Sequence, residues 1–246
     1  MYDNVKLLTD SAELNLSEVS RITKIDGLGP TTAAINTTQI GLNPGARFDS
    51  AHVDYRNIVI EFYIVSNVSD NLNELYSVIQ TGTKTTFQFK NKLICGYIES
   101  VEIDRTSNPV KGQISLICPN PAFYTELQSK SLSVSDYINY KGTQATGFKL
   151  YFTARTAVKN PFISINANKK TKKSTLNISI SAGDVLVLDS EAGQKSASIA
   201  SKKVYPYTGN FLWPELQPGD NSITIGAASG TVTAEILYSE KFAAIV

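Results

Sequence analysis

The 246-residue sequence predicts a mainly β protein of two domains, with one main helix in the first of them. Residues that favour strands, among them Thr, Ile, Val and Tyr, are frequent. Clear helical periodicity occurs in one place, whereas short apolar runs separated by turn signals recur along the chain. A chain of this length is expected to form one large domain or two small ones.

The first half is expected to contain buried strands and the main helix. The strand at residues 56–65 has an apolar face at a period of two. Its members are Ile58, Ile60, Phe62 and Ile64. A helix is predicted at about 70–81, because four apolar residues recur at the spacing i, i+3, i+4 and i+7. They are Leu72, Leu75, Tyr76 and Ile79. Asn71 and Glu74 have the spacing of a capping box, and Gly82 follows the predicted C-terminal end.

A change of pattern in the middle of the chain predicts a domain boundary. The run Cys118-Pro119-Asn120-Pro121 ends the β pattern, because proline cannot donate to a strand ladder and restricts the residue before it. A polar stretch, Gln128–Ser135, follows. We therefore predict an N-terminal domain at residues 1–128 and a C-terminal domain at residues 129–246.

The second half is expected to be an antiparallel β-sandwich. Short strands recur at regular spacing, turn signals separate them, and no helical pattern appears among them. The expected strands are at residues 147–153, 161–165, 174–181, 184–189, 196–200, 203–211, 221–226 and 230–238.

Charge and cysteine content distinguish the halves and disfavour several kinds of site. Residues 1–129 hold 10 basic and 14 acidic residues and residues 130–246 hold 13 and 8, so the net charges are −4 and +5. Cys95 and Cys118 lie in apolar runs, where buried free thiols are expected and a disulfide between paired strands is the alternative. No cysteine and histidine cluster has the spacing of a zinc site. The apolar run Ile58–Val65 is too short to span a bilayer, so no membrane insertion is expected.

No catalytic, metal-binding or cofactor-binding residue is predicted. His52 is the only histidine, and it lies in a polar segment with no serine or cysteine nucleophile motif nearby. Glu99, Glu102 and Asp104 lie along an expected strand, where solvated charge is the simpler interpretation. Folding can bring distant carboxylates together, so a hydrolase domain stays as a third hypothesis.

Two surface features leave a binding function open. Four lysines, expected in a loop between strands, form either a solvated loop tip or a contact for an anionic surface. They are Lys169, Lys170, Lys172 and Lys173. Trp213 has aromatic neighbours at Tyr205, Tyr207 and Phe211, and this group either packs at the edge of the sandwich or offers a platform for a sugar ring.

Five segments, in the order and spacing in which they occur, resemble the phage distal tail protein family, and together they extend over nearly the whole chain. They are Ile22–Pro30, Arg56–Val65 with the helix that follows it, Cys118–Tyr124, Gly183–Asp189 and Leu212–Ile225. The last segment contains the pattern Pro-x-Leu-x-Pro-Gly-x-Asn-x-Ile at residues 214–223. The second domain lacks a large insertion, which argues against a dedicated carbohydrate-binding module.

The resemblance implies a structural, non-enzymatic protein of the virion tail, made in the host cytoplasm. Its N-terminal domain would form a hexameric ring between the tail tube protein and the tail-associated hub protein. Its galectin-like C-terminal sandwich would dock receptor-binding or tail fibre proteins. DNA would pass through the lumen without sequence-specific binding, and the acidic balance of residues 1–129 suits a lumen that repels phosphate. A sandwich that binds carbohydrate at the host cell surface is the alternative function.

A ring of identical subunits needs two different patches on each subunit, and Gly41–Arg56 is the predicted candidate for one of them. This polar, hairpin-like segment carries both signs of charge and precedes a buried strand, so it can reach a neighbour without entering its own core. Arg47, Asp49, Asp54 and Arg56 are expected to pair across subunits and to fix their register. A mobile surface hairpin is the alternative.

Overall fold

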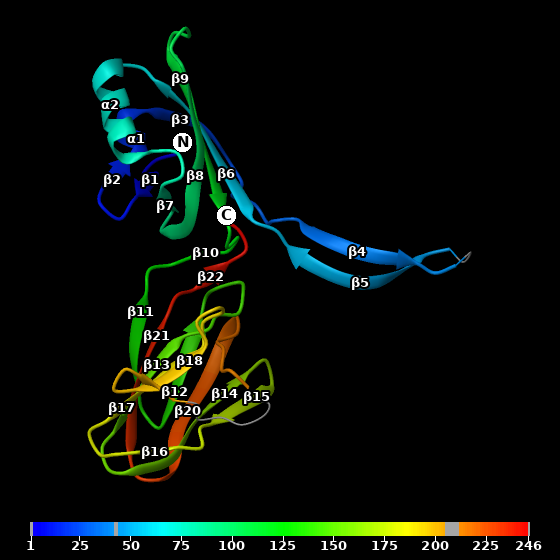
Figure 1. Ribbon diagram of the computed structural model, residues 1–246, viewed down its shortest axis with the longest axis vertical. Coiled ribbons are helices and arrows are strands. Elements are labelled where there is room, and N and C mark those ends of the chain that lie inside the picture. Colours follow the sequence, from blue (N-terminus) through cyan, green and yellow to red (C-terminus); the bar gives the residue numbers. More distant parts are fainter. Residues whose placement is uncertain (1, 42–43, 205–211, 246) are drawn as a thin grey trace. The chain divides into compact units, whose positions relative to one another are not determined.

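The structure is a computed structural model that describes residues 2–41, 44–204 and 212–245 (Figure 1). In these residues the chain is mainly β, with two helices, α1 (Leu16–Val19) and α2 (Val68–Val78). The chain divides into two compact units: unit 1 comprises residues 1–124 and 242–246, and unit 2 comprises residues 125–241. The predicted mainly β fold is confirmed. The units divide after Tyr124, whereas the sequence suggests a boundary after residue 128.

Unit 1 is built on an antiparallel sheet with the strand order β2-β1-β7-β8-β9-β6-β3. The short strand β10 pairs with β8 and with β22. The strands are β1 (Lys6–Leu8), β2 (Glu13–Asn15), β3 (Arg21–Asp26), β6 (Arg56–Ile64), β7 (Lys84–Phe89), β8 (Lys92–Asp104), β9 (Val110–Cys118), β10 (Phe123–Tyr124) and β22 (Lys241–Phe242).

One face of this sheet carries the core of unit 1. Every second residue of β6 from Ile58 to Ile64 is buried, as the period of two predicts. Leu16 of α1 and Leu72 and Leu75 of α2 belong to the same apolar cluster. The two helices therefore pack against the buried side of the sheet (Figure 1).

Helix α2 begins and ends earlier than the periodicity predicted. Its N-cap is Asn67, a residue type that tolerates the left-handed backbone found there (φ 48°). Asn71 and Glu74 consequently lie inside the helix rather than at its start. Ile79, the C-cap, is buried as expected, but Tyr76 is 38% exposed, so the apolar face is narrower than the sequence suggested.

A hairpin of β4 (Ala33–Gln39) and β5 (Ala46–Val53) extends from unit 1 as a separate two-stranded sheet (Figure 1). Every residue of β5 and nearly every residue of β4 is exposed. The sequence predicted a polar segment up to Gln39 and a hairpin within 41–56, so the first hairpin strand begins earlier than expected. Residues 42–43 of the expected tip lie outside the described residues.

Unit 2 is an antiparallel β-sandwich, as predicted. One sheet has the order β11-β21-β13-β17-β18-β19, and the other has the order β12-β20-β14-β15 with β16 beside β14. The strands are β11 (Gln128–Leu132), β12 (Ser135–Tyr140), β13 (Lys149–Ala154), β14 (Val158–Ala167), β15 (Lys170–Thr175), β16 (Ser179–Ile180), β17 (Val185–Asp189), β18 (Ser196–Ile199), β19 (Lys202–Lys203), β20 (Gly219–Ser229) and β21 (Val232–Tyr238). Phe152 and Leu186 from the first sheet and Ile163 and Ile223 from the second share one apolar core.

Unit 2 differs from the expectation in several places. Neither β11 nor β12 is among the expected strands, and the strand expected at 174–181 is divided between β15 and β16. The polar stretch at 128–135 contains β11, because an edge strand in which only Leu132 is buried looks polar in the sequence. The strand expected at 203–211 falls almost wholly outside the described residues.

In the described part of the chain, neither helix has the length and apolar character that crossing a membrane requires.

Candidate assembly surfaces

The β4–β5 hairpin has two chemically different faces. Asn36 pairs with Ser50 and Thr37 pairs with Phe48, so Asp49 is the extra residue of a bulge on β5. Paired residues lie on the same face, and successive residues along a strand alternate between faces. One face of the hairpin is therefore apolar and the other is polar.

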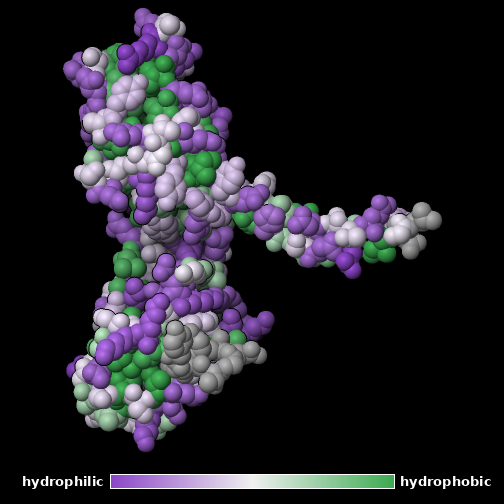
Figure 2. Space-filling model, in the orientation of Figure 1, coloured by the Kyte–Doolittle hydropathy of each residue, from purple (hydrophilic) through white to green (hydrophobic). Residues whose placement is uncertain are grey.

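The apolar face is open to water along its length. We call it the apolar hairpin face, and it consists of Ala33, Ile35, Thr37, Gln39, Ala46, Phe48, Ala51 and Val53, of which Thr37 and Gln39 are polar. Ile35 is 64%, Phe48 63% and Val53 51% exposed. Figure 2 shows hydrophobic residues at the surface of the hairpin. A two-stranded hairpin is only marginally stable by itself, and burial of each large apolar side chain contributes about 1.5–3 kcal/mol. This face is thus suited to a protein partner.

The polar face pairs its own charged groups. The Thr38 hydroxyl donates to the Asp49 carboxylate, and Arg47 Nε lies 3.0 Å from Asp49 Oδ1. Just beyond β5, Asp54 Oδ1 lies 3.4 Å from His52 Nε2. Arg47, Asp49 and Asp54, three of the predicted interface residues, therefore have partners within their own chain. An exposed ion pair such as Arg47–Asp49 contributes about 0–1 kcal/mol.

Arg56, the fourth predicted interface residue, is not available to a neighbour. It is 3% exposed, and its guanidinium donates to the backbone carbonyls of Gly27, Gly29, Pro121 and Ala243. Burial lowers the pKa of the guanidinium, and the Cys118 thiol acts in the opposite direction. Unit 1 itself surrounds this side chain, so the hydrogen bonds that Arg56 makes in the described residues lie within one subunit.

The apolar hairpin face is hard to detect in the sequence. Its large residues occur at Ile35 on one strand and at Phe48 and Val53 on the other. The extra residue Asp49 breaks their period of two, so β5 does not read as an alternating strand. The alternation of apolar residues along β5 can be recognised only if Asp49 is treated as the extra residue of a bulge.

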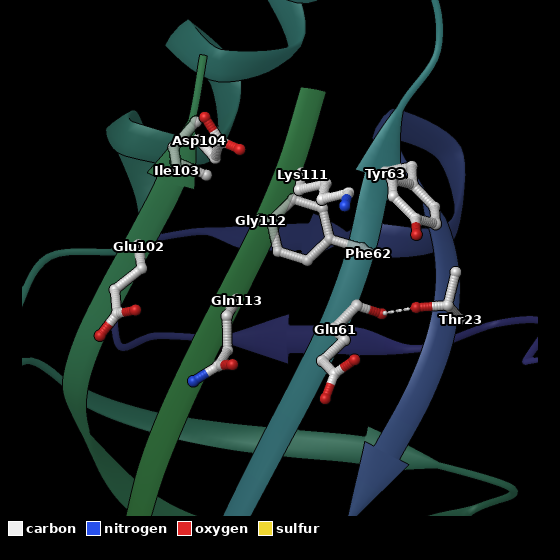
Figure 3. Close-up of a pocket in the computed structure, with 10 residues that line it drawn as sticks. All are labelled: Thr23, Glu61, Phe62, Tyr63, Glu102, Ile103, Asp104, Lys111, Gly112 and Gln113. Carbon is white, nitrogen blue, oxygen red and sulfur yellow. Dashed lines mark hydrogen bonds between the residues drawn. The ribbon is translucent and has the colours of Figure 1, made fainter. Parts of the chain in front are cut away.

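A second exposed surface is a pocket of about 400 Å³ on the sheet of unit 1 (Figure 3). Its lining consists of Thr23, Glu61, Phe62, Tyr63, Glu102, Ile103, Asp104, Lys111, Gly112 and Gln113. Glu61, Gln113 and Glu102 are register neighbours on β6, β9 and β8, and they lie in a row. The lining contains Glu61, Glu102 and Asp104 against a single lysine, Lys111. Hydrogen bonds from a neighbouring threonine hold the pKa of Asp104 below its ordinary value.

The residues weighed for catalysis lie on two elements, β5 and β8. His52 is on β5, and 59% of its side chain is exposed. Glu99, Glu102 and Asp104 are on β8, where Glu99 Oε2 accepts a hydrogen bond of 2.7 Å from Ser115 Oγ. Among the described residues, no group of three or more His, Cys, Asp or Glu side chains is arranged to hold a metal ion.

The lysine cluster lies mainly on a strand rather than in a loop. Lys170, Lys172 and Lys173 belong to β15, which ends the sheet order of unit 2 in the described residues, and Lys169 is in the preceding turn with a φ of 61°. Lys173 Nζ lies 4.0 Å from the centre of the Phe162 ring. Lysines on an edge strand oppose unwanted pairing with other strands. Protection of this edge is a structural role that Lys170, Lys172 and Lys173 can fill, and contact with an anionic surface stays a prediction.

Trp213 is partly buried and packs against the core of unit 2, which agrees with the packing interpretation. Its neighbours Tyr205, Tyr207 and Phe211 lie outside the described residues.

Cys95 and Cys118 are free thiols, the first half-buried and the second buried.

Residues 141–242 match a family model, that of the siphovirus-type tail component, C-terminal domain. No curated protein sequence matches the chain significantly. The matched range lies within unit 2 except for its last residue.

The whole chain also has counterparts among solved structures. The crystal structure of SPP1 Dit, described as a paradigm of the hub adsorption apparatus in phages that infect Gram-positive hosts, is 11% identical with a TM-score of 0.73. That match covers 97% of this chain and 99% of SPP1 Dit, so the fold is shared in both units. The phage P2 baseplate in its activated conformation with Ca matches at 9% identity and a TM-score of 0.46, over 96% of this chain and 98% of that one.

Proposed function

We propose that the protein joins the tail tube to the adsorption apparatus of a phage tail. Two findings support this proposal: residues 141–242 match the model of the siphovirus-type tail component, C-terminal domain, and the whole chain has the fold of SPP1 Dit. In this proposal six copies form a ring at the distal end of the tail. The ring contacts the tail tube protein and the tail-associated hub protein, and the sandwich of unit 2 docks receptor-binding or tail fibre proteins. The role is structural and not enzymatic.

The apolar hairpin face is the observation that carries the ring proposal. A closed ring needs a patch that reaches out and a different patch that receives it. The hairpin extends from unit 1, and Ile35, Phe48 and Val53 are more than half exposed on it. Burial of these side chains against the next subunit would stabilise each contact, and the contact recurs around the ring. The hairpin contributes mainly through these apolar residues, while Arg47 and Asp49 stay hydrated on its other face.

The acidic pocket supports a second part of the proposal, the passage of DNA. Glu61, Glu102 and Asp104 lie together on one exposed surface of unit 1. Such a surface at the lumen repels phosphate groups, so DNA is not held in transit. Because this interaction is electrostatic, it is screened over about 10 Å at moderate salt.

The ring proposal is tested by removing the apolar face while leaving the polar face intact. We expect the double variant Ile35→Ser, Phe48→Ser to stay monomeric at concentrations where the wild-type protein forms hexamers. The matched control is Asn36→Ser, which changes the polar face of the same strand. Native mass spectrometry or light scattering over a concentration series measures the particle mass.

Two results would contradict the proposal. If the Ile35→Ser, Phe48→Ser variant forms hexamers at the wild-type threshold, the apolar hairpin face is not the interface. If the intact protein stays monomeric at high concentration and also with tube and hub proteins present, the ring itself is excluded.

A further inference from the structure

Arg56 joins three segments of unit 1 that are far apart in the sequence. Its Nε donates to the Pro121 carbonyl at 2.7 Å and its Nη2 donates to the Ala243 carbonyl at 2.7 Å. Its Nη1 donates to the carbonyls of Gly27 and Gly29. The guanidinium carbon lies 4.4 Å from the centre of the Phe123 ring. A buried guanidinium is tolerated only while its donors are satisfied, so all three segments must be in place together.

The first of these segments is the base of the hairpin. Gly27 and Gly29 bond to Arg56, and the Leu28 carbonyl between them accepts a hydrogen bond of 2.9 Å from the Ile245 N–H. Gly27 has a φ of +86°, and a Cβ at this position would lie 2.1 Å from the Asn57 carbonyl oxygen. Only glycine fits this close approach, and β4 begins a few residues later.

The last of these segments follows the sandwich in the sequence. We call residues 242–245 the return segment, because the chain passes through unit 2 and then re-enters unit 1. Phe242 and Ile245 pack against the core of unit 1, and Lys92 Nζ lies 3.4 Å from the centre of the Phe242 ring. Unit 1 is therefore incomplete until a segment encoded after the whole sandwich has been made.

We infer that Arg56 and the return segment form a latch that sets the base of the β4–β5 hairpin, so that only a chain extending past its sandwich presents the hairpin for assembly. Without the return segment, Arg56 loses the Ala243 carbonyl and Leu28 loses its donor. Arg56 then carries an unsatisfied buried donor, which favours an open hairpin base. At synthesis rates of about 5–20 residues per second, the sandwich delays closure of the latch by roughly 6–23 s. The link to assembly rests on the proposed function, whereas the local ordering does not.

Hydrogen exchange measured by mass spectrometry on the wild-type protein and two variants tests the latch. One variant is truncated after Lys241, and the other is Arg56→Lys, which keeps the charge and loses the planar fork. We expect amides in peptides covering residues 21–33 to exchange roughly tenfold faster or more in both variants. Peptides of unit 2 should exchange at wild-type rates. Arg47→Lys, an arginine change on the exposed hairpin, is the matched control and should leave all rates unchanged.

Combining the two changes separates a latch from unrelated structural damage. Groups that act as one unit are not additive, so Arg56→Lys in the truncated chain should accelerate exchange little beyond truncation alone. Complete unfolding of unit 1 in the truncated chain with an intact sandwich also supports the dependence on residues 242–245. Wild-type exchange at residues 21–33 in both variants, or additive effects of the two changes, would overturn the inference. These readouts do not require a ring, so they remain decisive if the ring proposal fails.

Discussion

Cys118 shows how one buried residue takes its chemistry from its surroundings. It lies at the end of β9, opposite Arg56 in the strand register, and it is fully buried. Burial raises the pKa of its thiol to about 12, the nearby Cys95 adds to the rise and Arg56 opposes it. The buried thiol is therefore protonated at neutral pH and is a poor nucleophile.

We predict that the two thiols react at very different rates in the folded protein. A disulfide reagent at pH 8 should modify the half-buried Cys95 first and should reach Cys118 only after denaturant is added. Single Cys→Ala variants assign each phase. Equal rates at both positions in the native protein would contradict the buried environment described for Cys118.

The same pKa predicts a loss of stability in alkali. The folded pKa of Cys118, about 12, lies above the ordinary value, so the unfolded chain releases this proton first as pH rises. The contribution of the protonated Cys118 thiol to the unfolding free energy is fully present below about pH 8.5. It declines as the pH rises toward 12. The unfolding free energy of the wild-type protein should fall relative to that of Cys118→Ala over this range. A constant difference in urea titrations would exclude the effect.

Helix α2 shows how the stability of a single element depends on its contacts with the core. Its apolar stripe is short, because Leu72 and Leu75 are buried while Tyr76 is substantially exposed. An isolated helix of this length is marginal in water, so its stability comes from the contacts that Leu72 and Leu75 make in the core of unit 1.

We therefore predict different costs for two neighbouring substitutions in α2. Leu75→Ala should lower the unfolding free energy of unit 1 by about 2–5 kcal/mol, because it opens a cavity at a fully buried site. Tyr76→Ala, the control one residue away, should cost less than about 1 kcal/mol. Urea unfolding followed by far-UV circular dichroism measures both. Similar losses for the two variants would mean that α2 does not pack through Leu75.

At the scale of the whole molecule, unit 2 is an insertion within unit 1. Its core is drawn from its own two sheets. Its ends are tied together, since the Thr125 N–H donates to the Glu240 carbonyl and the Glu240 N–H donates to Thr125 Oγ1, each at 3.0 Å. Both units should therefore be separable if the cuts respect this arrangement.

We predict that residues 125–241 fold alone, whereas residues 1–124 are less stable without the return segment. Joining Tyr124 to Phe242 by a short Gly-Ser linker should restore a cooperative melting transition to unit 1, because β10 and β22 are paired. Dispersed amide NMR spectra and thermal melts are the readouts. A disordered spectrum for residues 125–241 would refute the independence of the sandwich.

The sequence by itself determines the local elements. The period of two in β6, the stripe of α2 and the regular turns of unit 2 are short-range patterns, and the structure confirms the strand, the helix and the sandwich they predict. Prediction fails where one residue departs from the pattern. The N-cap of α2 is Asn67, whose left-handed backbone the periodicity does not predict. The strand β11 is not predicted because only Leu132 in it is buried and its other residues are polar or exposed.

Tertiary structure alone decides which side chains are available. Arg56 looks like a surface charge in the sequence, yet it is buried because Gly27, Pro121 and Ala243 converge on it. Conversely, the large apolar residue Phe48 is exposed, because β5 pairs only with β4 in the described residues. Periodicity reports the conformation of neighbouring residues, whereas burial depends on contacts between residues up to 187 positions apart. For that reason the fold class can be read from the sequence, but the contacts of Arg56 and the apolar hairpin face cannot.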